Sequence, residues 1–233
     1  MPSRAVASSE ERAAIRSSFA VGLAVAAYGV SFGALSVAAG LDVWQTCVLS
    51  LFMFSGGSQF AVIGLIASGG TSAGMAAVTS AALLGVRNGL YAIRLAPVIR
   101  GPWWQRLLAG QFTIDETTAV ATAQPTPAAQ RAGFWWTGAI LYIGWNLTTL
   151  LGALLGDLIG DVGAFGLDAA AAAAFLGLLW PRLTRLQPVV VAVAAAVIAA
   201  LLTPTLPPGV PVLLAAGVAV LVGVFNWFER RIA

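Results

Sequence analysis

Residues 43–69 form an apolar stretch without a charged side chain. As one helix this stretch would be about 40 Å long at roughly 1.5 Å per residue, which exceeds the roughly 30 Å hydrocarbon core of a bilayer. Two adjacent glycines, Gly56 and Gly57, lie near its centre. The polar residues that flank them are Ser55, Ser58 and Gln59. Because glycine pairs weaken a helix and polar side chains can satisfy the freed backbone groups, we predict a helix broken at Gly56-Gly57.

This break has two interpretations. Broken helices near the middle of the membrane are typical of transporter binding sites. The second half-helix, which we expect to begin near Ser58-Gln59, would then direct its positive end at the gap. Alternatively, the glycines and serines form a packing face, because small residues let helices approach closely. The glycines alone favour neither interpretation, whereas Gln59 favours a substrate site.

The composition indicates that the surrounding solvent is lipid. Of the 233 residues, 59% are hydrophobic and 9% are charged, whereas soluble proteins carry about 25% charged residues. The predicted fold class is therefore an all-α, polytopic membrane protein in a lipid bilayer. The net charge of +3 comes from arginines scattered around apolar segments, so it indicates orientation in the membrane and no nucleic-acid partner. With no histidine and one cysteine, we expect no metal, no disulfide and no cofactor.

We predict seven to eight hydrophobic segments, of which the second is broken. They cover residues 17–39, 43–69, 72–98, 103–123, 132–156, 168–180, 187–203 and 211–228. Residues 1–16 are interpreted as a cytoplasmic tail that is retained, since no clear cleavage site precedes the first segment. Residues 17–124 then form a first membrane half, residues 125–131 a linker and residues 132–233 a second half.

Two topologies fit these segments. Eight crossings with the N-terminus inside leave Arg100 and Arg106 outside, against the positive-inside rule. In a second topology, residues 43–69 re-enter and residues 103–123 do not span, and these arginines become cytoplasmic. We favour eight crossings. Both topologies place both ends of the chain on the cytoplasmic side of the plasma membrane.

Charged residues inside apolar segments are candidates for function. Arg87, beside Asn88, lies in the third segment, where an arginine costs about 2.5–3.5 kcal/mol and normally faces a cavity or a carboxylate. Asp115 and Glu116 lie in the weak fourth segment, where they could carry protons or one of them could pair with Arg87. Alternatively, they occupy the first turn of a surface helix, which the helix dipole favours. The residues leave both alternatives open.

Small and polar residues mark further contacts between helices. Glycines recur every four residues in the first segment and in the fifth, and this spacing predicts close packing. These glycines are Gly29 and Gly33, then Gly152, Gly156 and Gly160. Tyr28 and Asn146 are candidate substrate contacts, although we favour an interhelical hydrogen bond for Asn146. Gly40-Leu41-Asp42 recurs as Gly166-Leu167-Asp168, which suggests duplicated halves, and Asp42 can cap the next helix.

Four motifs in this order resemble the AzlC family, the large subunit of bacterial branched-chain amino acid exporters. They are Tyr28-Gly29-Val30-Ser31-Phe32-Gly33, Phe54-Ser55-Gly56-Gly57-Ser58-Gln59-Phe60, Gly85-Val86-Arg87-Asn88-Gly89-Leu90-Tyr91 and Thr113-Ile114-Asp115-Glu116-Thr117. The resemblance covers most of the chain and is densest in its first half. It implies export of small apolar amino acids across the bacterial inner membrane, driven by an ion gradient. It also implies a separate small membrane partner of the AzlD type.

On this basis we assign roles to the candidate residues. Residues 55–59 and Asn88 would contact the substrate's ammonium and carboxylate groups, and Arg87 would bind the carboxylate or hold Asp115 ionised. Asp115 or Glu116 would take and release a proton. The aromatic residues expected to receive the substrate side chain are Phe32, Phe54 and Phe60. An intramembrane peptidase is disfavoured, because the chain has neither histidine nor lysine as a base. A noncatalytic assembly subunit and a transporter of another small solute remain alternatives.

Overall fold

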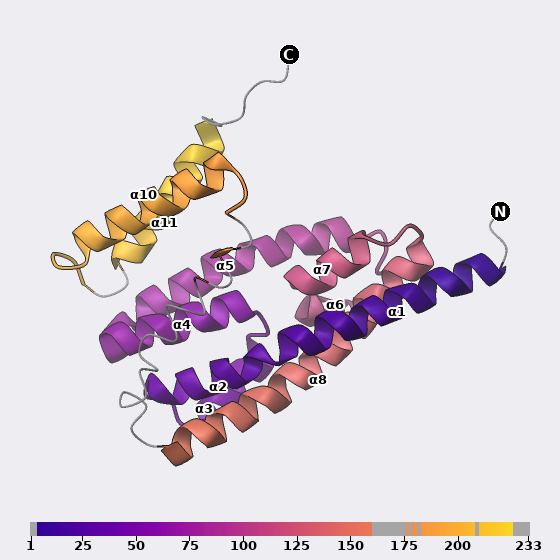
Figure 1. Ribbon diagram of the computed structural model, residues 1–233, viewed down its shortest axis with the longest axis horizontal. Helices are drawn as coiled ribbons and strands as arrows, with labels where there is room; N and C mark the ends of the chain where they lie inside the picture. The colour runs from indigo at the N-terminus through magenta and orange to yellow at the C-terminus, as the bar shows by residue number, and fades with distance from the viewer. Residues whose placement is uncertain (1–3, 160–175, 177–178, 181–182, 208–209, 226–233) are drawn as a thin grey trace.

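The computed structural model describes residues 4–159, 176, 179–180, 183–207 and 210–225. Every regular element in these residues is a helix (Figure 1), which confirms the predicted all-α fold class. Three helical stretches among them are long and apolar enough to cross a membrane, namely Ser9–Ala38, Gly74–Leu95 and Pro127–Leu158. The chain is therefore a membrane protein, as its composition requires.

Two long helical segments lie side by side and run in the same direction (Figure 1). The first consists of α1 (Arg4–Ala26) and α2 (Tyr28–Ala38), and the second is α8 (Pro127–Ile159). Gly22 lies against Ile140 and Gly33 against Thr149, so residue numbers rise together along both segments. Because α1 already begins at Arg4, most of the predicted tail is helical.

The glycines at this contact let the two backbones approach closely. A Cβ atom on Gly29 would lie 2.8 Å from the carbonyl oxygen of Trp145, and one on Gly156 would lie 3.1 Å from the Cα atom of Ala34. Gly33 and Gly152 are in equally close contact with the opposite backbone. The packing role predicted for these glycines is confirmed, and Gly160 lies outside the described residues.

The predicted second segment turns back at the centre of the molecule. α3 (Val43–Phe52) begins after the turn at Gly40, where a φ of +96° favours glycine. Asp42 caps α3 by accepting a hydrogen bond from the Gln45 amide, as predicted. α3 ends near the middle of α8, where the Ser50 hydroxyl lies 3.4 Å from that of Thr149. α4 (Gly56–Gly69) then returns to the end at which α3 began.

α4 and α5 (Gly74–Leu95) form an antiparallel pair joined by the 3-10 turn η1 (Gly70–Ala73). The Ser58 hydroxyl in the first turn of α4 donates to the carbonyl of Ala81, and Leu65 packs against Ala73 and Ala77. Of α3, α4 and α5, only α5 crosses the molecule. α3 and α4 form a re-entrant hairpin, which we call the first hairpin.

A second re-entrant hairpin enters from the opposite end. α6 (Trp103–Phe112) contacts α8 on its way to the centre, and α7 (Asp115–Thr122) returns along α8. The base of this hairpin is a cluster of Leu95, Ala109, Ala121 and Phe134. The tips of both hairpins meet at the centre, where the Gln111 side-chain amide donates to the carbonyl of Leu51 at 2.8 Å.

This arrangement decides between the two predicted topologies. The Arg131 guanidinium donates to the carbonyl of Arg100 at 3.1 Å, so both residues lie at the same end of the molecule. The favoured model of eight crossings places them on opposite sides and is therefore wrong. Residues 43–69 and 103–123 each re-enter, because the polar groups at their tips find partners inside the protein instead of in lipid.

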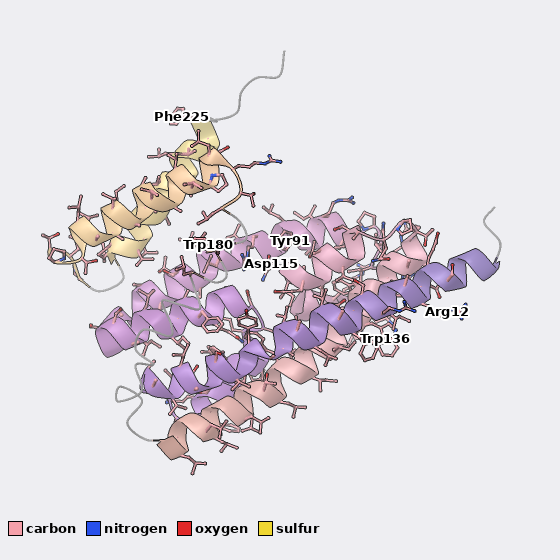
Figure 2. All side chains as sticks on the ribbon, viewed as in Figure 1. Arg12, Tyr91, Asp115, Trp136, Trp180 and Phe225 are labelled. Atoms are coloured by element: carbon pink, nitrogen blue, oxygen red, sulfur yellow. The ribbon has the colours of Figure 1, made fainter. Side chains whose placement is uncertain are left out.

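The remaining described helices form a separate pair. α10 (Leu186–Leu202) and α11 (Val210–Phe225) pack mainly on each other, and Leu213 of α11 touches the small cluster around Leu65 (Figure 1). Exposed apolar side chains, such as those of Trp136 and Phe225 in Figure 2, are suited to contact with lipid. Most of the predicted sixth segment, and Gly166-Leu167-Asp168, lie outside the described residues.

Candidate functional site

The tip of the first hairpin consists of three residues, Met53, Phe54 and Ser55, that are not helical. The predicted break is therefore present, but Gly56 and Gly57 form the first turn of α4 and do not lie in the gap. The reason is spatial: a Cβ atom on Gly56 would lie 3.3 Å from the Trp145 indole. The glycines thus allow neighbouring side chains to approach the start of α4.

Gln59 holds this tip in place. Its side chain is fully buried, and its amide nitrogen donates to the carbonyl of Met53 at 2.8 Å. Its carbonyl oxygen accepts a 2.8 Å hydrogen bond from the indole nitrogen of Trp145. Gln59 therefore satisfies a backbone group that the break has freed, and both ends of its side chain are already in use.

Replacing Gln59 with leucine is expected to destabilise the fold by about 1–3 kcal/mol, because the Met53 carbonyl and the Trp145 indole would lose their partner. Thermal unfolding of the purified protein in detergent should show a midpoint that is several degrees lower. Gln124→Leu is the control, because the only hydrogen bond of the Gln124 side chain to the described residues is the one that it donates to the Val120 carbonyl, one turn before it. Equal midpoints for both variants would contradict the role of Gln59.

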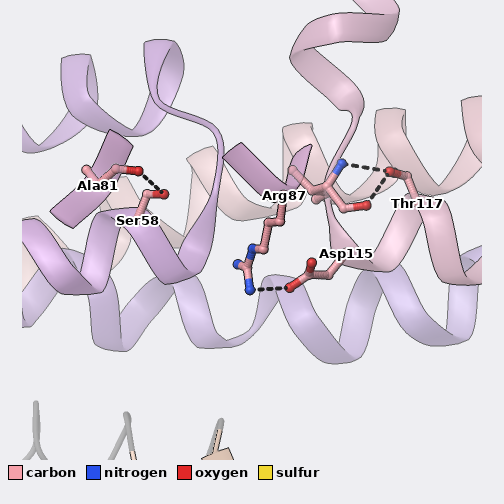
Figure 3. Close-up of polar contacts among 6 residues, drawn as sticks. Ser58, Ala81, Arg87, Asp115 and Thr117 are labelled. Atoms are coloured by element: carbon pink, nitrogen blue, oxygen red, sulfur yellow. Dashed lines mark hydrogen bonds and ion pairs between the residues drawn. The ribbon is translucent and has the colours of Figure 1, made fainter. Parts of the chain in front are cut away.

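The tip of the second hairpin is held in a similar way (Figure 3). The Thr117 hydroxyl accepts from the backbone N–H of Ile114 at 3.1 Å. It also donates to the carbonyl of Phe112 at 2.7 Å. α7 begins directly after this tip, with Asp115 and Glu116 in its first turn. The helix dipole favours carboxylates at that position.

Arg87 links the two hairpins. Its Nη1 atom lies 3.1 Å from Oδ2 of Asp115 (Figure 3). About a quarter of each side chain is exposed. A Cβ atom on Gly57 would lie 2.8 Å from Nη2 of Arg87. The guanidinium therefore lies between the first turn of α4 and the first turn of α7. The ion pair between Arg87 and Asp115, which the sequence gave as one of two alternatives, is present.

A cavity of about 510 Å³ opens beside the first tip, between α3, α4, α5 and α6. Its lining is mainly apolar and includes Phe54, Val62, Val78, Ala81, Ala82 and Gly85. The polar residues in its wall are Ser55, Ser58, Asn88, Gln111 and Thr113. The carbonyl oxygen of the Asn88 side chain is buried and has no hydrogen-bond partner. A ligand that donates a hydrogen bond could therefore satisfy it.

A second cavity of about 390 Å³ lies between the end of α5 and α6. It shares Gly110 and Thr113 with the first cavity, and its wall includes Arg100 and Arg106. The two cavities therefore adjoin along α6, and the arginines lie at the end of the molecule marked by Arg131. No group of three His, Cys, Asp or Glu side chains that could hold a metal ion occurs in the described part of the chain.

The structure brings together some of the predicted site residues. Ser55, Ser58 and Asn88 line the first cavity, as does Phe54. Arg87 and Asp115 are absent from its lining and lie at the neighbouring first turns of α4 and α7. The role predicted for each of these residues remains a prediction.

Other predicted residues lie elsewhere. Phe32 and Phe60 are buried against Trp145 in the main core, and Tyr28 is half exposed. Asn146 donates to the carbonyl of Tyr142 within α8, so the interhelical hydrogen bond favoured from the sequence is wrong.

The sequence did not indicate Trp145, Gln111 or Thr117 as residues that hold the tips. Each supports a tip through a contact that becomes visible only when the helices are placed together. The one available signal was a threonine three residues after Ile114, which is the spacing of a helix cap.

The model of the family described as AzlC protein matches residues 20–159, which is more than half of the chain. The chain belongs to the AzlC family. The AzlC match includes both hairpins, α5 and the Arg87–Asp115 pair, whereas α10 and α11 lie beyond it. AzlC proteins are associated with membrane transport. No curated protein and no solved structure matches the chain.

Proposed function

We propose that this AzlC protein is a secondary transporter that exports small apolar amino acids, coupled to protons, from the bacterial cytoplasm. The observation that carries the proposal is the meeting of two hairpin tips from opposite ends, with an ion pair between them and a mostly apolar cavity beside them. Transporter sites near mid-membrane are commonly built from such interrupted helices. A zwitterion with an apolar side chain has the chemistry that suits this combination.

The polar end of the substrate would bind at the tips. The buried Asn88 carbonyl oxygen lacks a donor, so it can accept a hydrogen bond from the substrate ammonium. The Ser55 side chain makes no capping hydrogen bond to α4 and is free to contribute. Ser58 and Gln59 already bond Ala81 and Met53, so their role is to shape the tip.

Arg87 and Asp115 would couple substrate to protons. While they are paired, the guanidinium is occupied and α5 is fastened to α7. Protonation of Asp115 removes its charge, and Arg87 can then bind a substrate carboxylate in a bidentate manner. Glu116 lies in the same turn and could pass the proton. Each hairpin would open towards the side from which it enters, which is a form of alternating access.

The first test is efflux of leucine from proteoliposomes that contain the purified protein. An acidic exterior should drive efflux against a leucine gradient, since protons would enter as substrate leaves. Asp115→Asn cannot exchange a proton, so pH-driven efflux should fall at least about 10-fold, equivalent to about 1.4 kcal/mol. Leucine exchange down its own gradient should change much less.

The efflux of Glu116→Gln is compared with that of Asp115→Asn. The variant that loses pH-driven efflux shows which carboxylate carries the proton. Retention of pH-driven efflux in both variants would contradict the coupling scheme.

If the wild-type protein moves no amino acid, with or without a small AzlD-type partner, the chain is an assembly subunit or carries another solute. Adding that partner also tests whether the transporter has two subunits. Labelling of both chain ends from each side tests their cytoplasmic location.

A further inference from the structure

One face of α5 forms a wall of the first cavity. Val78, Ala81, Ala82, Gly85 and Asn88 occupy this face at helical spacing, and Val62 of α4 also lines the cavity. Asn88 is therefore the polar end of an apolar wall. At about 510 Å³, the cavity lies within the range of small-molecule sites, roughly 300–1,000 Å³.

Gly85 borders open space in this wall. A Cβ atom built there would have no heavy atom within 4 Å, although the residue lines the cavity. It lies one helical turn before Asn88, so a substrate held by Asn88 would extend its side chain past Gly85. A methyl group added at this position would therefore enter open space beside the cavity wall without meeting a packed atom.

We propose that this cavity is the subsite for the aliphatic side chain of the substrate and that Gly85 sets the largest side chain that it accepts. This assignment rests on the proposed function and specifies its substrate class. A lipid acyl chain is the other apolar occupant, but it would leave the buried Asn88 oxygen without a donor, which is unfavourable. An amino acid satisfies both the apolar wall and that oxygen.

The test compares alanine with leucine in Gly85→Ala and Gly85→Leu. Efflux of leucine should fall in order of side-chain size and by at least about 10-fold in Gly85→Leu, since even one methylene group is worth about 10–200-fold in an apolar pocket. Alanine efflux should stay within about 2-fold of the wild type. The midpoint shift that each amino acid produces in thermal unfolding should change in the same way.

Gly223→Leu is the matched control, because Gly223 of α11 is exposed, has no heavy atom within 4 Å of its Cβ position and lines neither cavity. It should leave both amino acids unaffected. In Gly85→Leu, an equal loss of alanine efflux and leucine efflux, or no loss of either, would overturn the assignment of the subsite. Wild-type transport would still support the proposed function in that case. Absence of wild-type transport and binding would overturn both.

Discussion

Gly152→Val is expected to prevent stable folding. A Cβ atom on Gly152 would overlap the carbonyl oxygen of Val30 and lie 2.7 Å from its carbonyl carbon. These are backbone atoms of α2, so no rotamer change can make room for them. Overpacking at adaptable sites costs about 1–3 kcal/mol, and this contact should exceed about 3 kcal/mol because the two helices must separate.

Yield of monodisperse protein after extraction and its thermal unfolding in detergent measure this effect. Gly217→Val is the control. A Cβ atom on Gly217 of α11 would have no heavy atom within 4 Å, and the substitution changes helix propensity by the same amount as Gly152→Val. Wild-type yield and midpoint for Gly152→Val would contradict the parallel contact of α2 with α8, and with it the placement of both hairpins.

Arg87→Ala is expected to abolish substrate transport with little loss of stability. The guanidinium lies 3.1 Å from Oδ2 of Asp115, and it lies against the first turn of α4. Its removal should lower leucine efflux by at least about 10-fold, or about 1.4 kcal/mol. Arg87→Lys should restore only part of it, because an ammonium cannot form the bidentate contact.

Gly57→Val provides an independent route to the same defect. A Cβ atom on Gly57 would lie 2.8 Å from Nη2 of Arg87, which is the end of a flexible side chain and should be displaced. If both variants act through the guanidinium, the double variant Gly57→Val/Arg87→Ala should lose no more activity than Arg87→Ala alone. Additive losses would show that Gly57 acts elsewhere.

Two controls complete this experiment. Arg94→Ala removes an exposed arginine from the last turn of α5, and Gly74→Val places a side chain where no heavy atom lies within 4 Å. Both should retain wild-type efflux. Wild-type efflux in Arg87→Ala itself would contradict the assignment of this residue to substrate binding or coupling.

The structure contains two similar units, and their bounds differ from those of the predicted duplicated halves. Residues 43–95 and residues 103–159 each comprise a re-entrant hairpin followed by a crossing helix, and the two units enter from opposite ends. Each crossing helix holds the tip of the other unit, because Arg87 pairs with Asp115 and Trp145 bonds Gln59. Such an exchange involves single pairs, so no repeated motif was visible in the sequence.

The second break, at Thr113 and Ile114, was not predicted because it contains no glycine or proline. Its extended backbone is stabilised by the Thr117 hydroxyl and by contacts with α8. By contrast, the first break was predicted from Gly56 and Gly57, although these glycines serve close contact and the non-helical residues precede them. A glycine pair therefore marked the right region for a partly different reason.

The sequence by itself determined that this chain is a helical membrane protein, because its apolar runs and few charges can be buried only in lipid. It also indicated a broken second segment, the packing glycines and an arginine within an apolar segment that requires a partner. Only the tertiary structure decided that Asp115 is that partner and that both broken segments turn back. Those outcomes depend on contacts between residues that are far apart in the sequence, such as Gln111 with Leu51 and Trp145 with Gln59. Helical periodicity carries no information about which distant residues meet.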